Sequence, residues 1–575
     1  METRNHHDTQ VLIVGAGPVG LTLATDLAQR GIRVLIAETR HRGEPPNVKC
    51  NHVAARTMEI LRRLGVAKTV RNAGLPADYP NDVAYRTSFT GEELSRIEIP
   101  ARQDRVTDRQ QPDTGAPDTW WPTPEPPHRI NQIYLEPLLF AHAGQTPGVT
   151  ILNRTRIDRF EQDGDGVTAY GENIDTGESL IVRADYLIGC DGGRSAVRKQ
   201  IGAKLSGTDV VGRVQSTYFR APSLIKLQKH ERAWATFSLN PRRSGNVYAI
   251  DGKETWLVHN YLRADEEDFE AVDRDWALRQ ILGVGPDFEY EILSKEDWVG
   301  RRLVADKFRD RRVFICGDAS HLWIPMAGYG MNAGIADAMN LSWQLAARIH
   351  GWGGEHVLDG YETERMPITG QVSHFAMNHA IALQKEREGV PAGIEEPGEA
   401  GERARAAAGK ALYDLNVRQY CCAGLNFGYY YDASPLIAYD GEKQPAYGMD
   451  TFTPSTVPGC RTPHLWLDDG RSLYDAMGPE FTLLRLDTSV DVTPIVDAAR
   501  RRGLPLVVLD VKSAGAAGLY KEALVLSRPD QHVAWRGNAA PRDALALVDR
   551  VRGALPMAAP EAGMPSRLPA EASVA

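Results

Sequence analysis

Four residues near the N-terminus have the types and the spacing needed to bind a dinucleotide. Gly15, Gly17 and Gly20 form the pattern GxGxxG, and Glu38 stands at the end of the next apolar run. Glycines at these positions allow a tight turn and a close approach to a pyrophosphate, which the start of the following helix attracts. A carboxylate at the end of the second strand can accept hydrogen bonds from ribose hydroxyls. The pattern therefore predicts a dinucleotide site.

A second set of candidate residues lies far along the chain, in VFICGDASHLWIPMAGYGMN, residues 313–332. Asp318 and His321 follow an apolar run, in a loop that contains glycine and proline. We expect Asp318 to accept hydrogen bonds from hydroxyl groups and His321 to make a structural hydrogen bond. Free N–H groups at the start of the next helix favour an anionic partner. The residues at that helix start are Gly328, Gly330, Met331 and Asn332.

Strands and helices must hold these residues in place. VLIVGAG, PVGLTLATDLAQRG and IRVLIAE predict strand, helix and strand, which is one βαβ unit. Another apolar strand ends at Asp191 in GCDGGRSAVR, residues 189–198. Alternating segments from 206 to 290 predict an antiparallel sheet. From residue 481 onward the order β-α-β-β-β-α resembles a thioredoxin-like fold, but no cysteine follows Cys460, which excludes thiol redox chemistry there.

The composition excludes several classes of function. The 575 residues carry a net charge of −9, and Lys and Arg are dispersed, which argues against a nucleic-acid partner. No run of about 18 apolar residues is present, so no membrane span is expected. The six cysteines show neither a CxxC pair nor a metal-ligand spacing, so no metal site is expected. The N-terminus lacks an apolar signal core, and a cytoplasmic protein is expected.

These motifs, taken together, resemble those of one enzyme family. GCDGGRSAVR and GDASHLWIPMAGYGMNAGIADAMNLSW are similar to the DG and GD motifs of class A, single-component FAD-dependent aromatic hydroxylases. VKCNHVAARTMEILRRLG resembles the flavin-contacting helix entry of the subgroup that acts on phenols, hydroxybiphenyls and polyketide aromatics. GCRTPHLWLDDGRSLYDAMGPEFTLL resembles the passage into that subgroup's C-terminal domain. The resemblance covers nearly the whole chain.

The resemblance implies an α/β fold with three parts. These are a Rossmann-like FAD-binding domain of the glutathione-reductase/p-hydroxybenzoate-hydroxylase type, an antiparallel β-sheet substrate domain and a C-terminal thioredoxin-like domain. The expected boundaries are 1–86, 128–205 and 291–385 for the FAD-binding domain, 87–127 and 206–290 for the substrate domain, 386–450 for a helical linker, 451–555 for the thioredoxin-like domain without CxxC, and 556–575 for a disordered tail.

The resemblance also implies which residues bind FAD and the transient co-substrate, NADPH or NADH. Glu38 is expected at the adenosine ribose, Asp318 at the ribityl or pyrophosphate portion, and Asp191 near both nucleotides. Arg56 and Gln132 are expected at the phosphate and ribityl region, and Arg198 at the pyridine nucleotide's phosphates. A helix cap at Gln132 and a surface ion pair at Arg198 are the structural alternatives. The full cofactor set is Gly15, Gly17, Gly20, Glu38, Arg56, Gln132, Asp191, Arg198, Asp318, Gly328, Gly330, Met331 and Asn332.

The reaction implied by the family is hydroxylation of a phenol through a C4a-hydroperoxyflavin formed with O2. Pro325 lies where the family places a backbone carbonyl near the reacting ring. Relatives place a phenol-deprotonating histidine where this chain has Asn51, and the adjacent His52 is the alternative base. Further candidates to orient the phenol, on the expected substrate sheet, are Tyr218, Tyr261 and His259.

Other reactions on the same fold stay open at this point. A Baeyer–Villiger monooxygenase uses the same cofactors, and a flavin-dependent dehydrogenase or oxidase inserts no oxygen. A binding protein with a vestigial flavin is disfavoured because the glycine pattern, Asp191 and Asp318 are intact. The sequence chooses neither the aromatic substrate nor between NADH and NADPH, and it does not decide whether the chain forms a homodimer.

Overall fold

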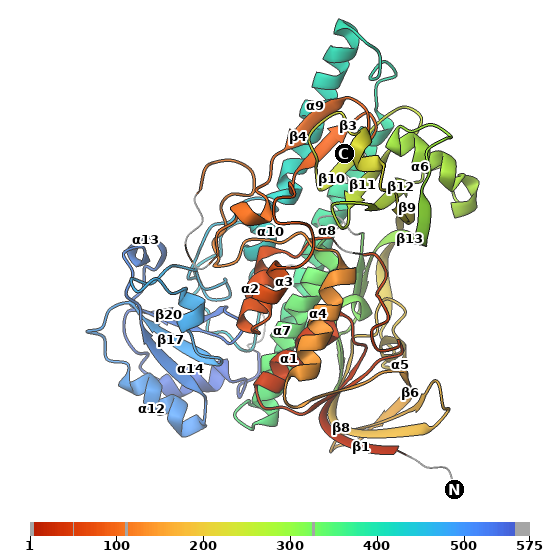
Figure 1. The fold of residues 1–575 in the computed structure, drawn as a ribbon. Coiled ribbons are helices and arrows are strands. Elements are labelled where there is room, and N and C mark those ends of the chain that lie inside the picture. The colour runs from red at the N-terminus through yellow and green to blue at the C-terminus, as the bar shows by residue number, and fades with distance from the viewer. Residues whose placement is uncertain (1–4, 50, 108, 110–112, 325–327, 558–575) are drawn as a thin grey trace.

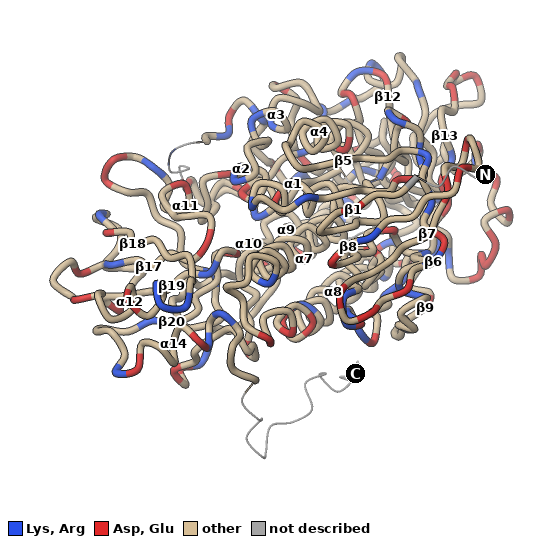
Figure 2. Tube along the Cα trace, turned by 90° about the horizontal axis from the view of Figure 1, so that it is seen from below, with Lys and Arg blue, Asp and Glu red and all other residues tan. Residues whose placement is uncertain are grey.

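Three β-sheets organise the chain in the computed structural model (Figure 1). The structure describes residues 5–49, 51–107, 109, 113–324 and 328–557. Two sheets have eight strands each, and the third, near the C-terminus, has four. None of the helices in these ranges is long and apolar enough to cross a membrane. Figure 2 shows Lys and Arg interspersed with Asp and Glu, as the dispersed charges of the sequence predict.

The first sheet brings three predicted loops to one edge. Its strand order is β14-β15-β8-β1-β2-β5, with β6 and β7 joined through β8. β1 runs parallel to β2 and β8, and β15 runs parallel to β8, so their carboxyl ends lie together. The strands are β1 (Asn5–Val14), β2 (Val34–Ala37), β5 (Val149–Leu152), β6 (Thr155–Gln162), β7 (Val167–Asn173), β8 (Ser179–Gly189), β14 (Arg309–Asp310) and β15 (Val313–Ile315).

Continuous apolar runs form the central strands of this sheet because helices cover them. Val11, Leu12 and Ile13 of β1 are fully buried, as expected for a parallel strand packed on both faces. Helix α1 (Pro18–Gln29) packs beside α4 (Gln132–Gln145) and α7 (Tyr329–Ile349), as Figure 1 shows. The predicted βαβ unit is confirmed.

The second sheet has the strand order β16-β13-β9-β12-β11-β10-β3-β4. It is antiparallel except where β10 pairs with β3. The strands are β3 (Val83–Arg86), β4 (Glu93–Ile97), β9 (Leu205–Arg220), β10 (Ala235–Ser238), β11 (Gly245–Ala249), β12 (Thr255–Tyr261), β13 (Glu291–Ala305) and β16 (His321–Trp323). The predicted antiparallel sheet between 206 and 290 is therefore confirmed, but the sheet extends beyond those limits.

The predicted domain boundaries at 86 and 290 cut this second sheet. β3, placed by the prediction in the FAD-binding domain, pairs with β10 of the second sheet. β13 begins at the predicted boundary and pairs with β9 along its length. β16, inside the GD motif, pairs with β13. Local sequence patterns do not reveal these partners, because strand pairing is decided between segments far apart in the chain.

The predicted helical linker packs against the second sheet. In α9 (Glu399–Tyr420), a Cβ on Gly409 would lie 2.1 Å from the carbonyl oxygen of Leu94 in β4. The remaining helices are α2 (Ala55–Arg63), α3 (Ala67–Arg71), α5 (Ala196–Gln200), α6 (Arg274–Leu282), α8 (Asp359–Glu388), α10 (Ala423–Phe427), α11 (Leu473–Ala476) and the short 3-10 turns η1 (Arg102–Asp104), η2 (Leu224–Leu227), η3 (Phe269–Ala271) and η4 (Gly317–Ala319).

The C-terminal sheet has the order β18-β17-β19-β20 and confirms the predicted β-α-β-β-β-α succession, with one additional short helix, α13. Of the predicted tail, residues 558–575 lie outside the described part of the chain. The elements are β17 (Phe481–Arg485), α12 (Thr493–Arg502), β18 (Leu506–Asp510), α13 (Ala516–Leu519), β19 (Leu524–Ser527), β20 (Val533–Gly537) and α14 (Ala544–Val551).

A buried ion pair fastens the C-terminal domain to the rest of the molecule. Arg528 follows β19, and its side chain is completely buried. Its Nη2 donates to Glu364 of α8 at 2.7 Å and to Asp530 at 2.6 Å. Asn340 of α7 donates to the same Glu364 at 2.6 Å. The C-terminal domain therefore completes the charge balance of a buried region between α7 and α8.

Replacing Arg528 with Met should destabilise the protein by about 3–5 kcal/mol, because Glu364 and Asp530 would be left as buried, uncompensated charges. Chemical denaturation monitored by circular dichroism measures this change. The matched control is Arg485→Met, which removes the exposed pair with Asp510 and should cost far less than the loss of Arg528, because solvent screens exposed pairs. Equal losses in the two variants would contradict the anchoring role of Arg528.

Candidate active site

In the first predicted loop, two of the three glycines are packed too closely against backbone to carry a side chain. Gly15 has φ +106°, and a Cβ there would lie 2.4 Å from the carbonyl oxygen of Cys190. A Cβ on Gly20 would lie 2.2 Å from the carbonyl oxygen of Gly15. At Gly17, the N-cap of α1, a Cβ would meet no atom within 4 Å. Gly15 and Gly20 thus permit backbone packing, and Gly17 faces open space.

That space is one large cavity of about 480 Å³ between the first and second sheets. Its lining falls into two parts with different chemistry. The first part comes from the predicted loops and helix starts: Gly17, Pro18, Gln132, Cys190, Gly192, Asp318, Gly328, Gly330 and Met331. The second part is rich in aromatic rings, mostly from the second sheet and the end of α9: Trp234, Tyr248, His259, Tyr261, Trp298 and Tyr420.

The polar end of the cavity fits a dinucleotide. Asp191 Oδ2 accepts hydrogen bonds from the backbone of Ala196 (2.7 Å) and Val197 (3.2 Å) in α5, but its buried Oδ1 has no partner in the described residues. Asp318 faces the cavity, and the surrounding protein raises the pKa of its carboxyl by desolvation. Asp191 itself does not line the cavity, whereas the carboxylate of Asp318 does and can accept hydrogen bonds from a ligand with hydroxyl groups.

Glu38 is in the predicted position after β2, and it already has partners. Its Oε2 accepts from the backbone N–H of Ala16 at 2.7 Å, and its Oε1 accepts from that of Arg40 at 2.9 Å. Burial raises the pKa of Glu38, but the hydrogen bonds from Arg40 outweigh this effect, so the pKa lies below its ordinary value. Glu38 is therefore ionised and braces the loop that contains Gly15 and Gly17.

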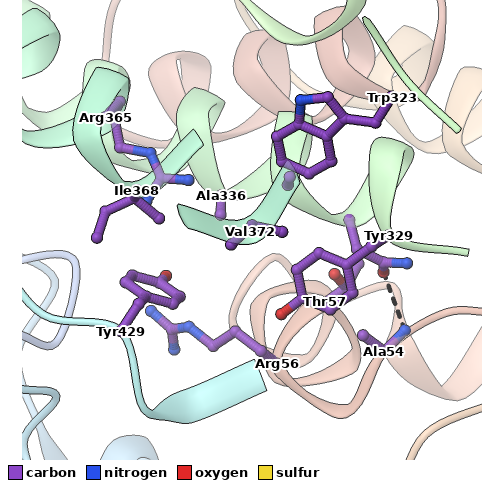
Figure 3. A pocket seen from close by; sticks show the side chains of 12 residues that line it. Ala54, Arg56, Thr57, Trp323, Tyr329, Ala336, Arg365, Ile368, Val372 and Tyr429 are labelled. Carbon is purple, nitrogen blue, oxygen red and sulfur yellow. Dashed lines mark hydrogen bonds between the residues drawn. The ribbon is translucent and has the colours of Figure 1, made fainter. Parts of the chain in front are cut away.

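Arg56 is not at the large cavity, contrary to the prediction. Its guanidinium donates to Glu59 and to Gln531, and its Nη2 donates to the backbone oxygen of Asp530 at 2.9 Å. Figure 3 shows the Arg56 side chain extending from α2 toward Tyr429, beside a second cavity of only about 10 Å³. Arg56 thus joins α2 to the C-terminal domain, because its guanidinium binds Glu59 of α2 and the loop that contains Asp530 and Gln531.

Two further predicted cofactor ligands also serve the protein itself. Arg198 donates to the backbone oxygens of Ala319 (3.0 Å) and Gly193 (2.9 Å), so it ties the DG loop to the GD loop. Asn332 accepts from the backbone N–H of Ala54 at 2.9 Å, the bond drawn in Figure 3. The contacts of Arg198 with a pyridine nucleotide and of Asn332 with FAD stay predictions, and in this structure both side chains bond to the protein.

Gln132 and the remaining predicted residues of α7 do line the cavity. Gln132 is the first residue of α4, where Asn131 provides the cap, and its side chain donates to Glu136 at 3.0 Å. Gly328 is the N-cap of α7 with φ +63°, and a Cβ on Gly330 would meet no atom within 4 Å. The start of α7, which carries the positive end of the helix dipole, therefore lies at the cavity.

His52 and Asn51, the two candidates for a base, both line the cavity. Nδ1 of His52 accepts a hydrogen bond from Arg129, because a guanidinium can only donate. Burial, together with the charges of Arg129 and Arg105, lowers the pKa of His52 well below its usual value. His52 is therefore neutral at physiological pH, with its proton on Nε2. Asn51 accepts from the side chain of Asn131.

Of the three candidates on the second sheet, His259 and Tyr261 line the cavity and Tyr218 does not. His259 lines the cavity, with its Nδ1 2.7 Å from Ser216 Oγ, which also accepts from Trp298 Nε1 at 2.8 Å. Tyr261 lines the cavity as well, and its hydroxyl accepts from Asn246 at 3.2 Å. Tyr218 is not among the lining residues, because it lies farther along β9, opposite Leu257.

The structural hydrogen bond expected at His321 is present. Nε2 of His321 lies 2.7 Å from Asp337 Oδ2, and Arg365 Nε donates to the other oxygen of Asp337 at 2.7 Å. The His321 ring stacks on Trp323 with a centroid distance of 4.6 Å. His321 therefore holds the GD loop against α7. Pro325, whose backbone carbonyl is predicted to lie near the reacting ring, is outside the residues that the structure describes.

Several residues of the aromatic part were not predicted. Trp234, Tyr248 and Trp298 come from the second sheet and its connections, and Tyr420 ends α9. Arg129 lies three residues before Gln132 and shares the cavity with it. The alternating strands signalled that the sheet has an exposed face, but only packing shows which aromatic rings turn toward the cofactor site.

Known proteins resemble this chain over most of its length. A family model described as "FAD binding domain" matches residues 8–376, and one described as "Aromatic-ring hydroxylase, C-terminal" matches residues 455–555. The FAD-dependent monooxygenase apdD of Emericella nidulans is 31% identical, over 94% of this chain and 89% of that protein. The tetracenomycin B2 monooxygenase-dioxygenase of Streptomyces olivaceus is 32% identical, over 94% of this chain and 97% of that protein.

A solved structure agrees with the fold. The structure of the rebeccamycin biosynthetic enzyme RebC with reduced flavin matches with a TM-score of 0.85 and 34% sequence identity. The match covers 96% of this chain and 100% of that one. All three sheets are therefore part of one known architecture.

Gly17→Ala should weaken FAD binding by about tenfold or more without unfolding the protein. The added methyl group has room in the protein but occupies space where the backbone approaches a pyrophosphate. FAD fluorescence titration and the melting temperature of the apoprotein measure the two effects. Gly20→Ala is the contrasting variant: its Cβ would strike the backbone of Gly15, and overpacking of this kind costs about 1–3 kcal/mol. Unchanged FAD affinity in Gly17→Ala would argue against this phosphate position.

His259 should make the stability of the protein depend on pH. Burial and the charge of Arg387 lower the pKa of His259 to about 3. The unfolded chain then takes up a proton below about pH 6.5 that the folded chain does not, so stability falls as the pH decreases. Between pH 7 and about pH 5 this contributes a loss of about 2 kcal/mol, which His259→Gln should remove. Urea denaturation at both pH values measures it, and His41→Gln, at an exposed site, should leave the loss unchanged.

Proposed function

The chain belongs to the family of FAD-dependent aromatic-ring monooxygenases, and from this we propose that it hydroxylates a phenolic ring held in the aromatic part of the large cavity. The protein uses FAD and, as co-substrate, NADPH or NADH. O2 is the proposed oxygen donor, and the substrate is a small aromatic molecule. The observation that carries the proposal is the single cavity that joins Gly17 and Asp318 to the aromatic rings of Trp298 and Tyr420.

The residues at the polar end support the binding of FAD. We propose that Gly17 and the first turn of α1 receive the pyrophosphate, and that Asp318, Asp191 and Gln132 accept or donate hydrogen bonds along the ribityl chain. When bound, FAD accepts hydride from the reduced nicotinamide and activates O2 for transfer to the ring. The start of α7, at Gly330, supplies N–H groups and a positive dipole end where negative charge develops on the cofactor.

The aromatic end supports the binding of a ring and the exclusion of water. His259 packs edge to face against Tyr248, at a centroid distance of 5.4 Å, and against Trp298, at 5.8 Å. His259 Nδ1 is engaged with Ser216, so its Nε2 is the nitrogen available to a phenolic oxygen. Because His259 stays neutral, it positions the oxygen by hydrogen bonding and does not supply a charge. Exclusion of bulk water limits the wasteful release of peroxide.

The division of labour between the sheets follows from this proposal. The first sheet, with α1 and α7, binds FAD, and the second sheet, with the end of α9, binds the substrate. The GD segment contributes to both, since β15 belongs to the first sheet and β16 to the second. The C-terminal domain supports α7 and α8, and none of its described residues lines the large cavity.

Incubation of the FAD-containing enzyme with NADPH, 18O2 and a panel of phenols tests the function. We expect substrate-stimulated oxidation of NADPH or NADH and a product that carries one 18O atom on the ring. Mass spectrometry identifies the label, and a parallel peroxide assay measures uncoupled turnover. Formation of peroxide alone, or of a desaturated product without label, across the whole panel would sink the proposal.

A further inference from the structure

Arg129 is a buried arginine in the wall of the large cavity. It lies between the bridge at Val53–His128 and the cap of α4, and its exposed fraction is 4%. Its guanidinium carbon lies 4.3 Å from the centroid of the Trp234 ring and 5.6 Å from that of Tyr420. The cation is therefore located in the aromatic, substrate-side part of the cavity.

The hydrogen bonding of this guanidinium is incomplete. One terminal nitrogen, Nη1, donates to His52. The other, Nη2, is buried and has no hydrogen-bond partner among the residues described here. Arg129 also forms no ion pair with those residues. The charge of Asp118 acts on Arg129, but the carboxylate of Asp118 pairs with Arg105. Two cations thus share one carboxylate in this region.

An arrangement of this kind is costly without a ligand. Arginine stays protonated inside proteins, and a buried charge without an anion loses its hydration with no compensating pair. The stacking on Trp234 and Tyr420 offsets only part of this loss. The neighbouring His52 is neutral, so it accepts a hydrogen bond from Arg129 without balancing its charge. Among the described residues no anion balances the charge of Arg129, and an anion bound in the cavity would do so.

We propose that Arg129 binds an oxyanion of the aromatic substrate, such as a carboxylate or an ionised acidic phenol. The inference rests on the proposed function and narrows the substrate class. Aromatic rings beside the guanidinium contact the faces of a flat substrate, while the guanidinium forms a charge-assisted hydrogen bond to its oxyanion. Neutral aromatic molecules of the same shape lack this partner and bind more weakly.

Paired ligands test the proposal on the FAD-containing enzyme without turnover. The probes are 3-hydroxy-2-naphthoate against its methyl ester, and 4-nitro-1-naphthol against its methyl ether. Quenching of tryptophan fluorescence and perturbation of the FAD absorption spectrum report binding. We expect at least one anion to bind about tenfold tighter than its neutral partner, the factor for one charge-assisted hydrogen bond. The naphthoate pair identifies a carboxylate and the nitronaphthol pair an ionised phenol.

Arg129→Met should abolish this preference, and Arg129→Lys should restore part of it. The matched control is Arg263→Met, an exposed arginine that follows β12 of the second sheet, which should leave the preference intact. The ligand-free Arg129→Met protein should melt no lower than the wild type, because an unpaired buried cation has been removed.

The outcomes separate this proposal from the function on which it rests. Equal binding of both members of each pair, failure of all four probes to bind, or a preference that persists in Arg129→Met would overturn the role of Arg129. A large drop in the melting temperature of Arg129→Met would assign the residue a structural role instead. Oxyanion selectivity without any hydroxylation would leave Arg129 as the anion site and reject the proposed reaction.

Discussion

The close contact between the ends of β1 and β8 is the constraint on which the site depends. No Cβ fits between Gly15 and the carbonyl of Cys190, or between Gly20 and Gly15. The same holds where α7 crosses α1, because a Cβ on Gly334 would lie 2.7 Å from the side chain of Val19. Backbone packing at this density brings two helix starts and the DG loop to one edge of the sheet. A cofactor can then contact all of them at once.

The GD segment connects this edge to the second sheet. β15 ends in the first sheet, Asp318 follows in η4, and β16 pairs with β13 in the second sheet. The segment is therefore the junction of the two sheets as well as part of the cofactor site. This explains why one cavity has a polar end and an aromatic end. It also explains why His321, at the junction, is fixed by Asp337 rather than left available for chemistry.

The buried arginines Arg528, Arg365, Arg56 and Arg129 differ in whether a carboxylate balances their charge. Arg528 and Arg365 lie in networks with buried carboxylates, where each charge is balanced and the gain is orientation of α7 and α8. Arg56 belongs to the same class through Glu59. Arg129 does not, since its only polar partner among the described residues is a neutral histidine. The charge of Arg129, which no described residue balances, is therefore the basis for expecting an anionic group on the ligand.

Local patterns were sufficient for the parts of the fold that depend on local physics. The glycine pattern, the apolar strands and the helix starts follow from backbone sterics and periodicity, and they correctly predicted the βαβ unit, the C-terminal succession and the places of Gly17, Asp318 and Gly330. The same patterns misassigned β3 and β13, because a strand's sequence records its exposed and buried faces but not its neighbour.

Local sequence patterns also could not predict which residues each side chain contacts, because those partners come from distant parts of the chain. Arg56 and Arg198 match the family's motifs, yet packing brings Glu59 and two loop carbonyls to their guanidinium groups. Arg129 and Tyr420 carry no motif, yet the fold brings them together across the chain. The sequence by itself determined the dinucleotide-binding edge and the class of enzyme, since these rest on backbone geometry encoded within short segments. Only the tertiary structure decided which charges are balanced and which rings face the cavity, because both depend on contacts between residues hundreds of positions apart.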